Sequence, residues 1–263
     1  MTTLSFDAGA AAYDRFMGRW SRLYVPALLD GVELAAGHRV LDVATGTGEA
    51  AEPAAARVGP SGGVVGIDIS LPMLRAAKGR AAGRLALAAM DAQALGCRDQ
   101  AFDAVICQLG LMFVPDLDRA LRDFRRVLRP GGRLGACVWS TPDRVPFVGF
   151  LADALSRQLP DQRAALHIGF SLADPARLGE ALAGAGFRDV RTARETRRIV
   201  FESFEDYWGP VEAGGARLGQ AYRGLPEPAK RVVVEELRTR LAAFRSAGPI
   251  AMEADALQAF ARR

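Results

Sequence analysis

The chain has 263 residues, of which 50% are hydrophobic and 24% charged, and it carries a formal net charge of +4. This composition is that of an ordinary globular protein, long enough for one large α/β domain with additions. The chain has no apolar run near the ~20 residues that a membrane-spanning helix needs. Its N-terminal residues lack the basic start and apolar core of a signal peptide. We therefore expect a cytoplasmic protein that does not enter a membrane.

The cysteines and histidines are too few and too scattered for a structural framework. Cys97, Cys107 and Cys137 are an odd number, are widely spaced and form no CxxC pair, and the chain has only two histidines. Neither a disulfide framework nor a zinc site fits this pattern. We expect the cysteines to be buried as small apolar side chains, and we expect no metal site.

The positive charge comes from dispersed arginines, since Lys78 and Lys230 are the only lysines. The densest group is Arg122, Arg125, Arg126 and Arg129. On a helix these arginines share one face, opposite an apolar face, as on a solvated outer helix. A nucleic-acid-binding protein is expected to show a longer basic stripe with stacking aromatic residues. We therefore expect no nucleic-acid partner.

The first predicted element is a helix near the N-terminus with an aromatic stripe. Tyr13, Phe16, Trp20 and Tyr24 stand at i, i+3, i+7 and i+11, which places them along one side of a helix. Taken alone, such a stripe usually packs into a core.

The middle of the chain alternates strand and helix patterns. Strands are predicted at 38–43, 63–69, 84–89, 102–107 and 132–139, and helices at about 47–57, 71–82 and 116–129. The second helix begins after Ser70, a good N-cap, and the third ends before Pro130-Gly131-Gly132, a helix breaker. Such alternation implies right-handed crossovers and a mostly parallel sheet with helices on both faces.

The C-terminal part of the chain follows a different order. Asp174-Pro175 begins another helix, a long strand is predicted at 187–200, and a final strand at 249–261. Between these two strands, 203–212 and 227–245 have helical patterns. Because the chain shows neither an internal repeat nor a low-complexity linker, we predict a single domain over 1–263.

The stretch VLDVATGTGEAA, residues 40–51, reads as a buried strand, a glycine-rich turn and a helix. Gly46-x-Gly48-x-x-Ala51 formally matches the dinucleotide fingerprint, and Asp68 follows where a ribose-binding acid is expected. Asp42, however, would put negative charge where a pyrophosphate binds. S-adenosylmethionine carries a sulfonium and an ammonium and no phosphate, so an acid at this strand end favours it over NAD.

The region 38–139 resembles the class I S-adenosylmethionine-dependent methyltransferases, closest in style to the small-molecule enzymes of ubiquinone and menaquinone biosynthesis. Four motifs carry the resemblance in the family's order: VLDVATGTG, VVGIDIS, AMDAQAL with FDAVICQLGLMFVPD, and RVLRPGGRL. The resemblance implies a Rossmann-like α/β fold with an N-terminal helical lid (1–35), a cofactor-binding core (36–140), and an acceptor-side cap that also completes the sheet (141–263). It also implies methyl transfer to a small molecule, aromatic, quinone-like or another secondary metabolite.

The resemblance also assigns roles to individual positions. At the methionine end of S-adenosylmethionine it implies Asp42, Ala44, Thr45, Gly46 and Gly48, with Ala44 standing where many members have glycine. It implies Asp68 at the ribose, Ile69 and Met73 on the adenine, Asp91 and Ala92 at the adenine edge, and Gln108 beside the reactive methyl group. A lid would bring Tyr13 and Trp20 to the cofactor. Each acid also has a structural alternative, as a turn cap or a helix-start residue.

The acceptor side is less defined by the sequence. An apolar lining is expected from Phe16, Phe113, Trp139, Phe147 and Phe170. Methyl transfer can proceed through positioning alone when the acceptor is already nucleophilic.

An alcohol or phenol acceptor would instead benefit from a general base, for which His167 is the first candidate. His38 precedes the first strand, at the wrong end of the sheet, and Asp143 ranks below both. Three other functions remain open: a non-catalytic S-adenosylmethionine-binding partner or sensor, a nicotinamide-dependent oxidoreductase, and a nucleic-acid methyltransferase. QLGLMF after the fourth strand lacks the Asn/Asp-Pro-Pro-aromatic run typical of base methylation.

Overall fold

The computed structural model describes residues 10–80, 85–245 and 248–263. Its centre is a seven-stranded sheet in the order β3-β2-β1-β4-β5-β7-β6. The strands are β1 (Arg39–Val43), β2 (Gly63–Asp68), β3 (Ala86–Ala89), β4 (Phe102–Gln108), β5 (Leu128–Trp139), β6 (Arg188–Phe201) and β7 (Ile250–Arg262). The first five are parallel, and β7 pairs antiparallel with both β5 and β6. The predicted Rossmann-like, mostly parallel sheet is therefore confirmed.

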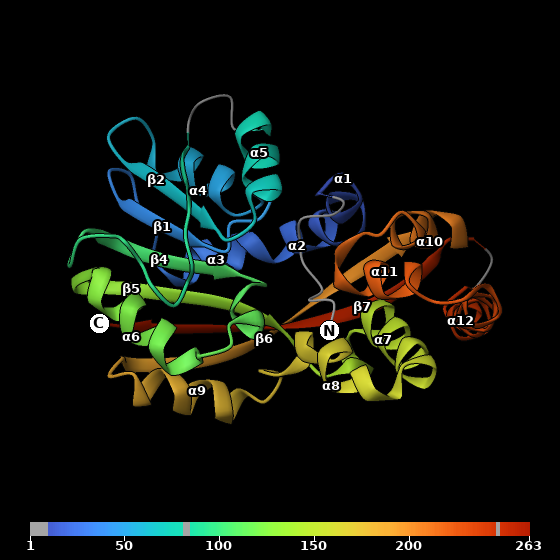
Figure 1. Ribbon diagram of the computed structural model, residues 1–263. Coiled ribbons are helices and arrows are strands. Elements are labelled where there is room, and N and C mark those ends of the chain that lie inside the picture. The colour runs from blue at the N-terminus through green and yellow to red at the C-terminus, as the bar shows by residue number, and fades with distance from the viewer. Residues whose placement is uncertain (1–9, 81–84, 246–247) are drawn as a thin grey trace.

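Helices cover both faces of this sheet, and further helices lie beyond one end of it (Figure 1). They are α1 (Ala10–Tyr13), α2 (Arg19–Ser21), α3 (Val25–Gly31), α4 (Ala51–Val58), α5 (Leu71–Arg80), α6 (Leu117–Val127), α7 (Pro146–Gln158), α8 (Arg163–Leu166), α9 (Pro175–Gly184), α10 (Phe204–Glu212), α11 (Ala216–Arg223) and α12 (Glu227–Ala242). In Figure 1, α6 and α9 lie on the near side of the sheet, while α3 and α4 lie behind it. The parts of the predictions that fall on 1–9, 81–84 and 246–247 lie outside the described residues.

Two predicted boundaries differ from the structure more than the others do. The helix after the glycine turn begins at Ala51 rather than near 47, because the turn continues through Ala50. The fifth strand begins at Leu128 rather than 132, so Pro130-Gly131-Gly132 lies within it. The register with β4 shifts here: Phe102 pairs with Leu128 and Ala104 with Arg133, so β5 holds three more residues than β4 over this stretch.

The C-terminal hairpin carries most of the cap. β6 and β7 are paired from Arg188–Arg262 to Phe201–Ile250, and their connection holds α10, α11 and α12. Figure 1 shows these helices and α7 gathered at one end of the long hairpin, beyond the ends of the parallel strands. The cap thus stands beside the edge of the sheet where parallel strands end.

The N-terminal segment is a chain of short helices with one π-helical turn, Asp14–Gly18, between α1 and α2. A π turn adds a residue and shifts the faces of the helix, so the aromatic stripe divides. Tyr24 is fully buried and donates a 2.7 Å hydrogen bond to the Ala254 carbonyl. Phe16 is also buried, 6.0 Å from the ring of Phe147. The stripe anchors this segment to the hairpin and the cap.

Three further findings concern sequence features considered above. Cys97, Cys107 and Cys137 are free thiols, and the latter two are buried. No helix among the described residues is long and apolar enough to cross a bilayer. Those residues also contain no group of three or more His, Cys, Asp or Glu side chains suited to a metal ion.

Candidate active site

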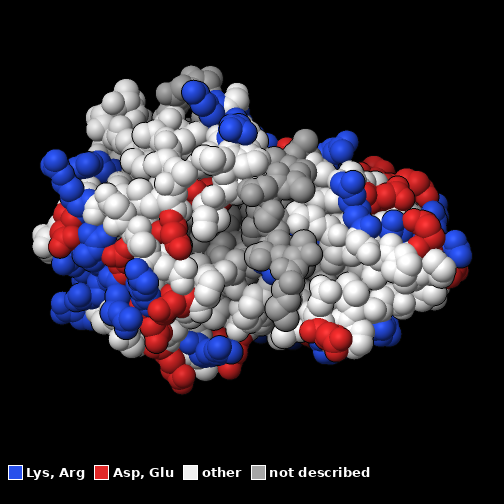
Figure 2. Space-filling model, viewed as in Figure 1, with Lys and Arg blue, Asp and Glu red and all other residues white. Residues whose placement is uncertain are grey.

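A cleft of about 540 Å³ opens at the carboxyl edge of the parallel strands. It lies where β1 and β4 are neighbours and the chain direction of the crossovers reverses, the usual ligand site of an open α/β sheet. Its volume is within the range of ~300–1,000 Å³ typical of small-molecule sites. Figure 2 shows this face hollowed near its centre, with uncharged residues and a few acidic side chains to the left of the hollow.

Nine of the predicted cofactor residues line this cleft. They are Tyr13, Ala44, Gly46, Asp68, Ile69, Met73, Asp91, Ala92 and Gln108. They come from the N-terminal segment and from the segments that follow β1, β2, β3 and β4. The topology therefore brings together residues that are far apart in the sequence.

The strand ends beside the cleft have an uncommon backbone. Ala44 after β1 has φ 55° and Leu109 after β4 has φ 51°, both in the left-handed region that non-glycine residues rarely adopt. The Ala44 side chain fits because its neighbour is a glycine: a Cβ built on Gly110 would lie 2.5 Å from the Ala44 Cβ. These two turns direct the backbone away from the sheet and leave the cleft open between them.

Asp42 lies behind the cleft rather than in its lining. It is fully buried, and one carboxylate oxygen accepts a 2.6 Å hydrogen bond from the Thr45 hydroxyl. The other oxygen has no partner within the described part of the chain. Burial raises the pKa of Asp42 to about 7, although the Thr45 hydrogen bond opposes the shift. A cationic group bound at the adjacent turn would stabilise the ionised form of the Asp42 carboxylate.

Asp68 connects the glycine turn to the end of β2. Its carboxylate accepts 2.9 Å hydrogen bonds from the backbone N–H groups of Gly46 and Ser70. A carboxylate has about four acceptor positions, so one in the cleft wall can also accept from the hydroxyls of a ligand. Ile69, 72% exposed, lies next to it on the cleft wall, and Met73 is buried beneath. An exposed isoleucine at a cleft suits a flat apolar ring.

The other side of the cleft presents amide and carboxylate groups. Asp91 accepts hydrogen bonds from the backbone and side-chain nitrogens of Gln93, at 2.8 and 3.1 Å. Gln108 donates from Nε2 to the Ser21 carbonyl at 3.0 Å, which ties β4 to the N-terminal segment. Its buried Oε1 has no partner in the residues that the structure describes. A buried unpaired acceptor at a cleft is suited to a ligand donor.

Three other predicted cofactor residues, besides Asp42, are not among the lining residues. Thr45 and Gly48 shape the turn from behind, Thr45 by its bond to Asp42 and Gly48 by its φ of 91°. Trp20 instead packs edge-on against Phe201, 5.1 Å between centroids, with Arg19 over its ring. The π turn rotates Trp20 toward the cap while Tyr13 faces the cleft, so Trp20 is a packing residue in this structure.

A second cavity, of about 60 Å³, adjoins the cleft and is lined almost entirely by apolar side chains. Four of the five predicted acceptor residues line it: Phe16, Phe113, Trp139 and Phe170. Phe147 does not. It is fully buried behind the cavity, with its ring 5.8 Å from that of Trp139. Tyr13, Leu109, Phe113 and Arg217 line both cavities, so the two spaces lie side by side.

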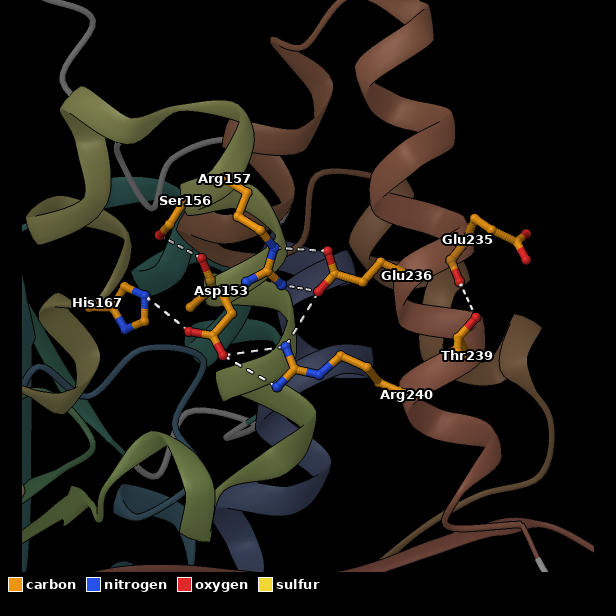
Figure 3. A network of polar contacts seen from close by, with 9 residues as sticks. Asp153, Ser156, Arg157, His167, Glu235, Glu236, Thr239 and Arg240 are labelled. Atoms are coloured by element: carbon orange, nitrogen blue, oxygen red, sulfur yellow. Dashed lines mark hydrogen bonds and ion pairs between the residues drawn. The ribbon is translucent and has the colours of Figure 1, made fainter.

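His167, the predicted base, is directed away from the site. Its neighbours Leu166 and Ile168 line the apolar cavity, but its Nε2 lies 3.5 Å from an Asp153 carboxylate oxygen on α7. Figure 3 shows the imidazole turned toward Asp153, whose other oxygen contacts Arg240 of α12. Burial lowers the pKa of His167, against the attraction of Asp153. The segment around His167 lies beside the apolar cavity, as predicted. The position of the His167 ring, however, does not fit the predicted role as a base, because the short helix α8 turns the ring toward α7.

The sequence reasoning did not identify Arg217. It is in the first turn of α11, and it is the one cation among the lining residues that the structure describes in either cavity. Two adjacent glycines, Gly214 and Gly215, precede this helix and could have indicated the turn. No pattern distinguishes Arg217 from the other arginines of the chain.

Comparison with known proteins decides the family. Residues 40–132 match the methyltransferase domain family model. The chain is 33% identical to nocamycin O-methyltransferase of Saccharothrix syringae over 93% of this chain and 92% of that protein. The chain belongs to the S-adenosylmethionine-dependent methyltransferases.

Other relatives of this methyltransferase agree. The demethylmenaquinone methyltransferase of Mycolicibacterium paratuberculosis is 34% identical over 74% of this chain and 89% of that protein. A methyltransferase-fold crystal structure from Bacillus halodurans superposes with TM-score 0.62 at 19% identity, covering 90% of this chain and 97% of the other, which shows the shared fold. The methyl donor is S-adenosylmethionine, and the reaction is methyl transfer to a small-molecule acceptor. A nicotinamide-dependent oxidoreductase and a non-catalytic binding protein are therefore set aside.

Proposed function

We propose that this methyltransferase methylates an apolar small molecule, of aromatic or quinone-like character, held in the cavity beside the cleft. The observation that carries the proposal is the shared lining of the two spaces. Tyr13, Leu109 and Phe113 line both a cleft with several polar groups and a cavity walled by aromatic and aliphatic side chains. Apolar walls with few polar groups are typical of sites for apolar ligands.

In this proposal the cleft residues hold the methyl donor. Asp68 accepts from the ribose hydroxyls, Ile69 and Met73 contact the adenine, and Asp91 and Ala92 lie at its edge. Gln108 accepts through its unpaired Oε1, and Gly46 and Ala44 allow close approach of the backbone. The bound donor supplies an electrophilic methyl group whose leaving group is a neutral thioether.

The chain's own part in the chemistry is positioning and exclusion of water. Among the described residues that line the cavities, the titratable groups are Tyr13, Asp68, Asp91 and Arg217. Burial raises the pKa of Tyr13, so its hydroxyl stays neutral and can only donate or accept a hydrogen bond. Both acids lie on the cleft wall away from the apolar cavity. We therefore propose that no general base is used and that proximity drives the transfer.

The apolar cavity, of about 60 Å³, is smaller than an aromatic ring requires. Its lining includes the N-terminal segment (Phe16, Met17) and the first turn of α11 (Ala216, Leu218), which come from opposite ends of the chain. We propose that residues 1–35 act as a lid and that acceptor entry separates these walls. Residues 1–9 of that lid lie outside the described residues.

The experiment is an acceptor panel with radiolabelled S-adenosylmethionine. Hydroquinones and hydroxynaphthalenes should be methylated, whereas phosphoethanolamine, a small polar amine, should not. Phe113→Ala and Phe170→Ala should raise the acceptor KM ~10-fold or more, since each removes ring contacts. Phe150→Ala is the matched control, because Phe150 packs on Phe244 outside both cavities. Preference for phosphoethanolamine, or equal effects of all three variants, would contradict the proposal.

Two coarser features complete the proposal. We propose a cytoplasmic location, consistent with three free cysteines, and no nucleic-acid partner. The arginines of α6 support the latter, because Arg126 bonds Asp99 and Asp123, and Arg125 donates to the Gly186 carbonyl. In Figure 2 the basic side chains at that end of the molecule are interspersed with acidic ones.

A further inference from the structure

Arg217 has an unusual position at the junction of the two cavities. It is the second residue of α11, and it lines both the cleft and the apolar cavity. Its neighbours Ala216 and Leu218 line the apolar cavity as well, so the first turn of the helix faces that space. Ala216 has a left-handed backbone, φ 57°, which helps set the direction of this turn.

The Arg217 guanidinium is unpaired within the described part of the chain. Its Nε is buried and unbonded, and no hydrogen bond or ion pair joins Arg217 to any other residue that the structure describes. The chain pairs many of its other partly buried arginines, for example Arg80 with Asp14 and Glu49, and Arg19 with Asp206. A partly buried guanidinium without a nearby anion is unfavourable, and burial lowers the pKa of Arg217 accordingly.

The position of Arg217 at the start of α11 is electrostatically unfavourable for a cation. The N-terminus of a helix carries a partial positive charge, so an arginine in the first turn is repelled by it. The same two features favour an anion, which the guanidinium and the helix N-terminus would attract together. The other described residues that line the apolar cavity are uncharged. The arrangement is therefore suited to a ligand with an apolar body and one anionic oxygen.

We propose that Arg217 is a specificity-determining residue that binds an anionic oxygen of the methyl acceptor, a carboxylate or a phenolate. This inference rests on the proposed function, since it requires the donor in the cleft and the acceptor in the apolar cavity. The competing ligand is the carboxylate of the methyl donor itself. The acceptor is favoured because Arg217 and its helical turn line the apolar cavity together with Phe16, Trp139 and Phe170.

The test measures ligand binding to the full chain saturated with S-adenosylhomocysteine. Benzoate and benzamide form a probe pair of the same shape that differs in charge, and hexanoate with hexanamide forms an aliphatic pair. 4-Nitrophenol titrated across its own pKa distinguishes phenolate from carboxylate recognition. Dissociation constants are measured by ligand-observed NMR for the wild type, Arg217→Met, Arg217→Lys and, as a control from the same helix, Arg223→Met. Arg223 is exposed and lies outside both cavities.

The wild type should bind each tested anion at least 10-fold more tightly than its neutral partner or neutral form. Arg217→Met should abolish that preference, Arg217→Lys should keep part of it, and Arg223→Met should keep all of it. Arg217→Met should change the affinity for S-adenosylhomocysteine less than 2-fold and should not lower the Tm, because it removes an unpaired charge.

Two results would overturn the assignment, and they are distinguishable from a failure of the cofactor site. Equal binding of anion and neutral partner by the wild type would show that no anion is recognised. A 10-fold loss of S-adenosylhomocysteine affinity in Arg217→Met would show that Arg217 binds the donor's carboxylate instead. If the wild type did not bind S-adenosylhomocysteine at all, the proposed cofactor site would be wrong, and the role assigned to Arg217 would be wrong as well.

Discussion

The Thr45 hydroxyl donates a 2.6 Å hydrogen bond to one carboxylate oxygen of the fully buried Asp42, whose other oxygen is unpaired within the described part of the chain. A carboxylate in this setting destabilises the fold when it ionises. Its pKa is about 7 in the folded chain against an ordinary value of 3.8. The folded state therefore retains the proton over a pH range in which the unfolded chain has released it.

The first prediction follows from the sign of that shift. The contribution of Asp42 to stability is fully present below pH ~4 and is lost as the pH rises through about 7. The loss is on the order of 4 kcal/mol at 1.36 kcal/mol per pKa unit. Asp42→Asn should therefore be more stable than the wild type at pH 8 and gain much less at pH 5. Urea unfolding at both pH values tests this, and an Asn advantage independent of pH would contradict it.

The second prediction concerns the close approach of Ala44 and Gly110. A Cβ at position 110 would lie 2.5 Å from that of Ala44, so Gly110→Ala should push the two strand ends apart. We expect ~1–3 kcal/mol of destabilisation and weaker cofactor binding. Ala44→Gly alone should be close to neutral, and Ala44→Gly with Gly110→Ala should recover most of the loss. The double-mutant cycle is measured by thermal unfolding. Additive effects would show that the contact is not the cause.

The third prediction concerns Asp68. Asp68→Ala removes the acceptor of the Gly46 N–H and the proposed ribose ligand together. The affinity for S-adenosylhomocysteine should fall ~10–100-fold, as expected for a lost charge-assisted contact. Asp161→Ala, at an exposed position on the cap, should leave the affinity unchanged. Isothermal calorimetry measures these affinities. A folded Asp68→Ala protein with unchanged affinity would show that Asp68 has only a structural role, bonding the Gly46 turn to the end of β2.

The fourth prediction concerns the attachment of the N-terminal segment. Glu49, buried beside the glycine turn, accepts a 2.9 Å bond from Arg80 and lies 3.7 Å from Arg22 of that segment. Arg80 also pairs with Asp14 at 2.9 Å. Glu49→Gln should loosen residues 10–24 and speed their amide hydrogen exchange several-fold.

The control for the fourth prediction is Glu52→Gln, at a position in the first turn of α4. Glu52 has no ion pair within the described part of the chain, so its substitution should not alter exchange. An unchanged exchange rate over residues 10–24 in Glu49→Gln would show that apolar packing alone holds the segment.

The fifth prediction is that His167 does not act as a base. Because its ring faces Asp153 and not the apolar cavity, His167→Ala should leave kcat within ~2-fold of the wild type and its pH profile unchanged. A loss of ~100-fold, the size expected when a general base is removed, would mean that the ring turns into the cavity during turnover.

The sequence predicted the sheet well because its strands have short apolar runs separated by clear caps and glycines. Asp42, Asp68, Asp91 and Gln108 could be placed near one another, because parallel strands end at the same edge. Side-chain direction could not be predicted in the same way. The π turn that separates Tyr13 from Trp20 leaves no local pattern, and His167 is turned by the packing of α8 on α7.

Arg217 shows the same limit for the acceptor side. Its neighbours in space come from the N-terminal segment, the end of β5 and the segment after α8, far from it in the chain. A lone arginine in a helical stretch is read from sequence as a solvated side chain. The role proposed for Arg217 depends on its position between the two cavities and on its unpaired guanidinium within the described residues.

The most direct test of the account is a crystal structure of the chain with S-adenosylhomocysteine. We predict its ribose hydroxyls on Asp68, its adenine between Ile69 and Ala92, and its sulfur directed toward the junction at Tyr13, Leu109 and Phe113. The apolar cavity should then lie directly beyond the sulfur. A ligand with its sulfur directed away from that cavity, or bound outside the cleft, would contradict the assignment of both donor and acceptor sites.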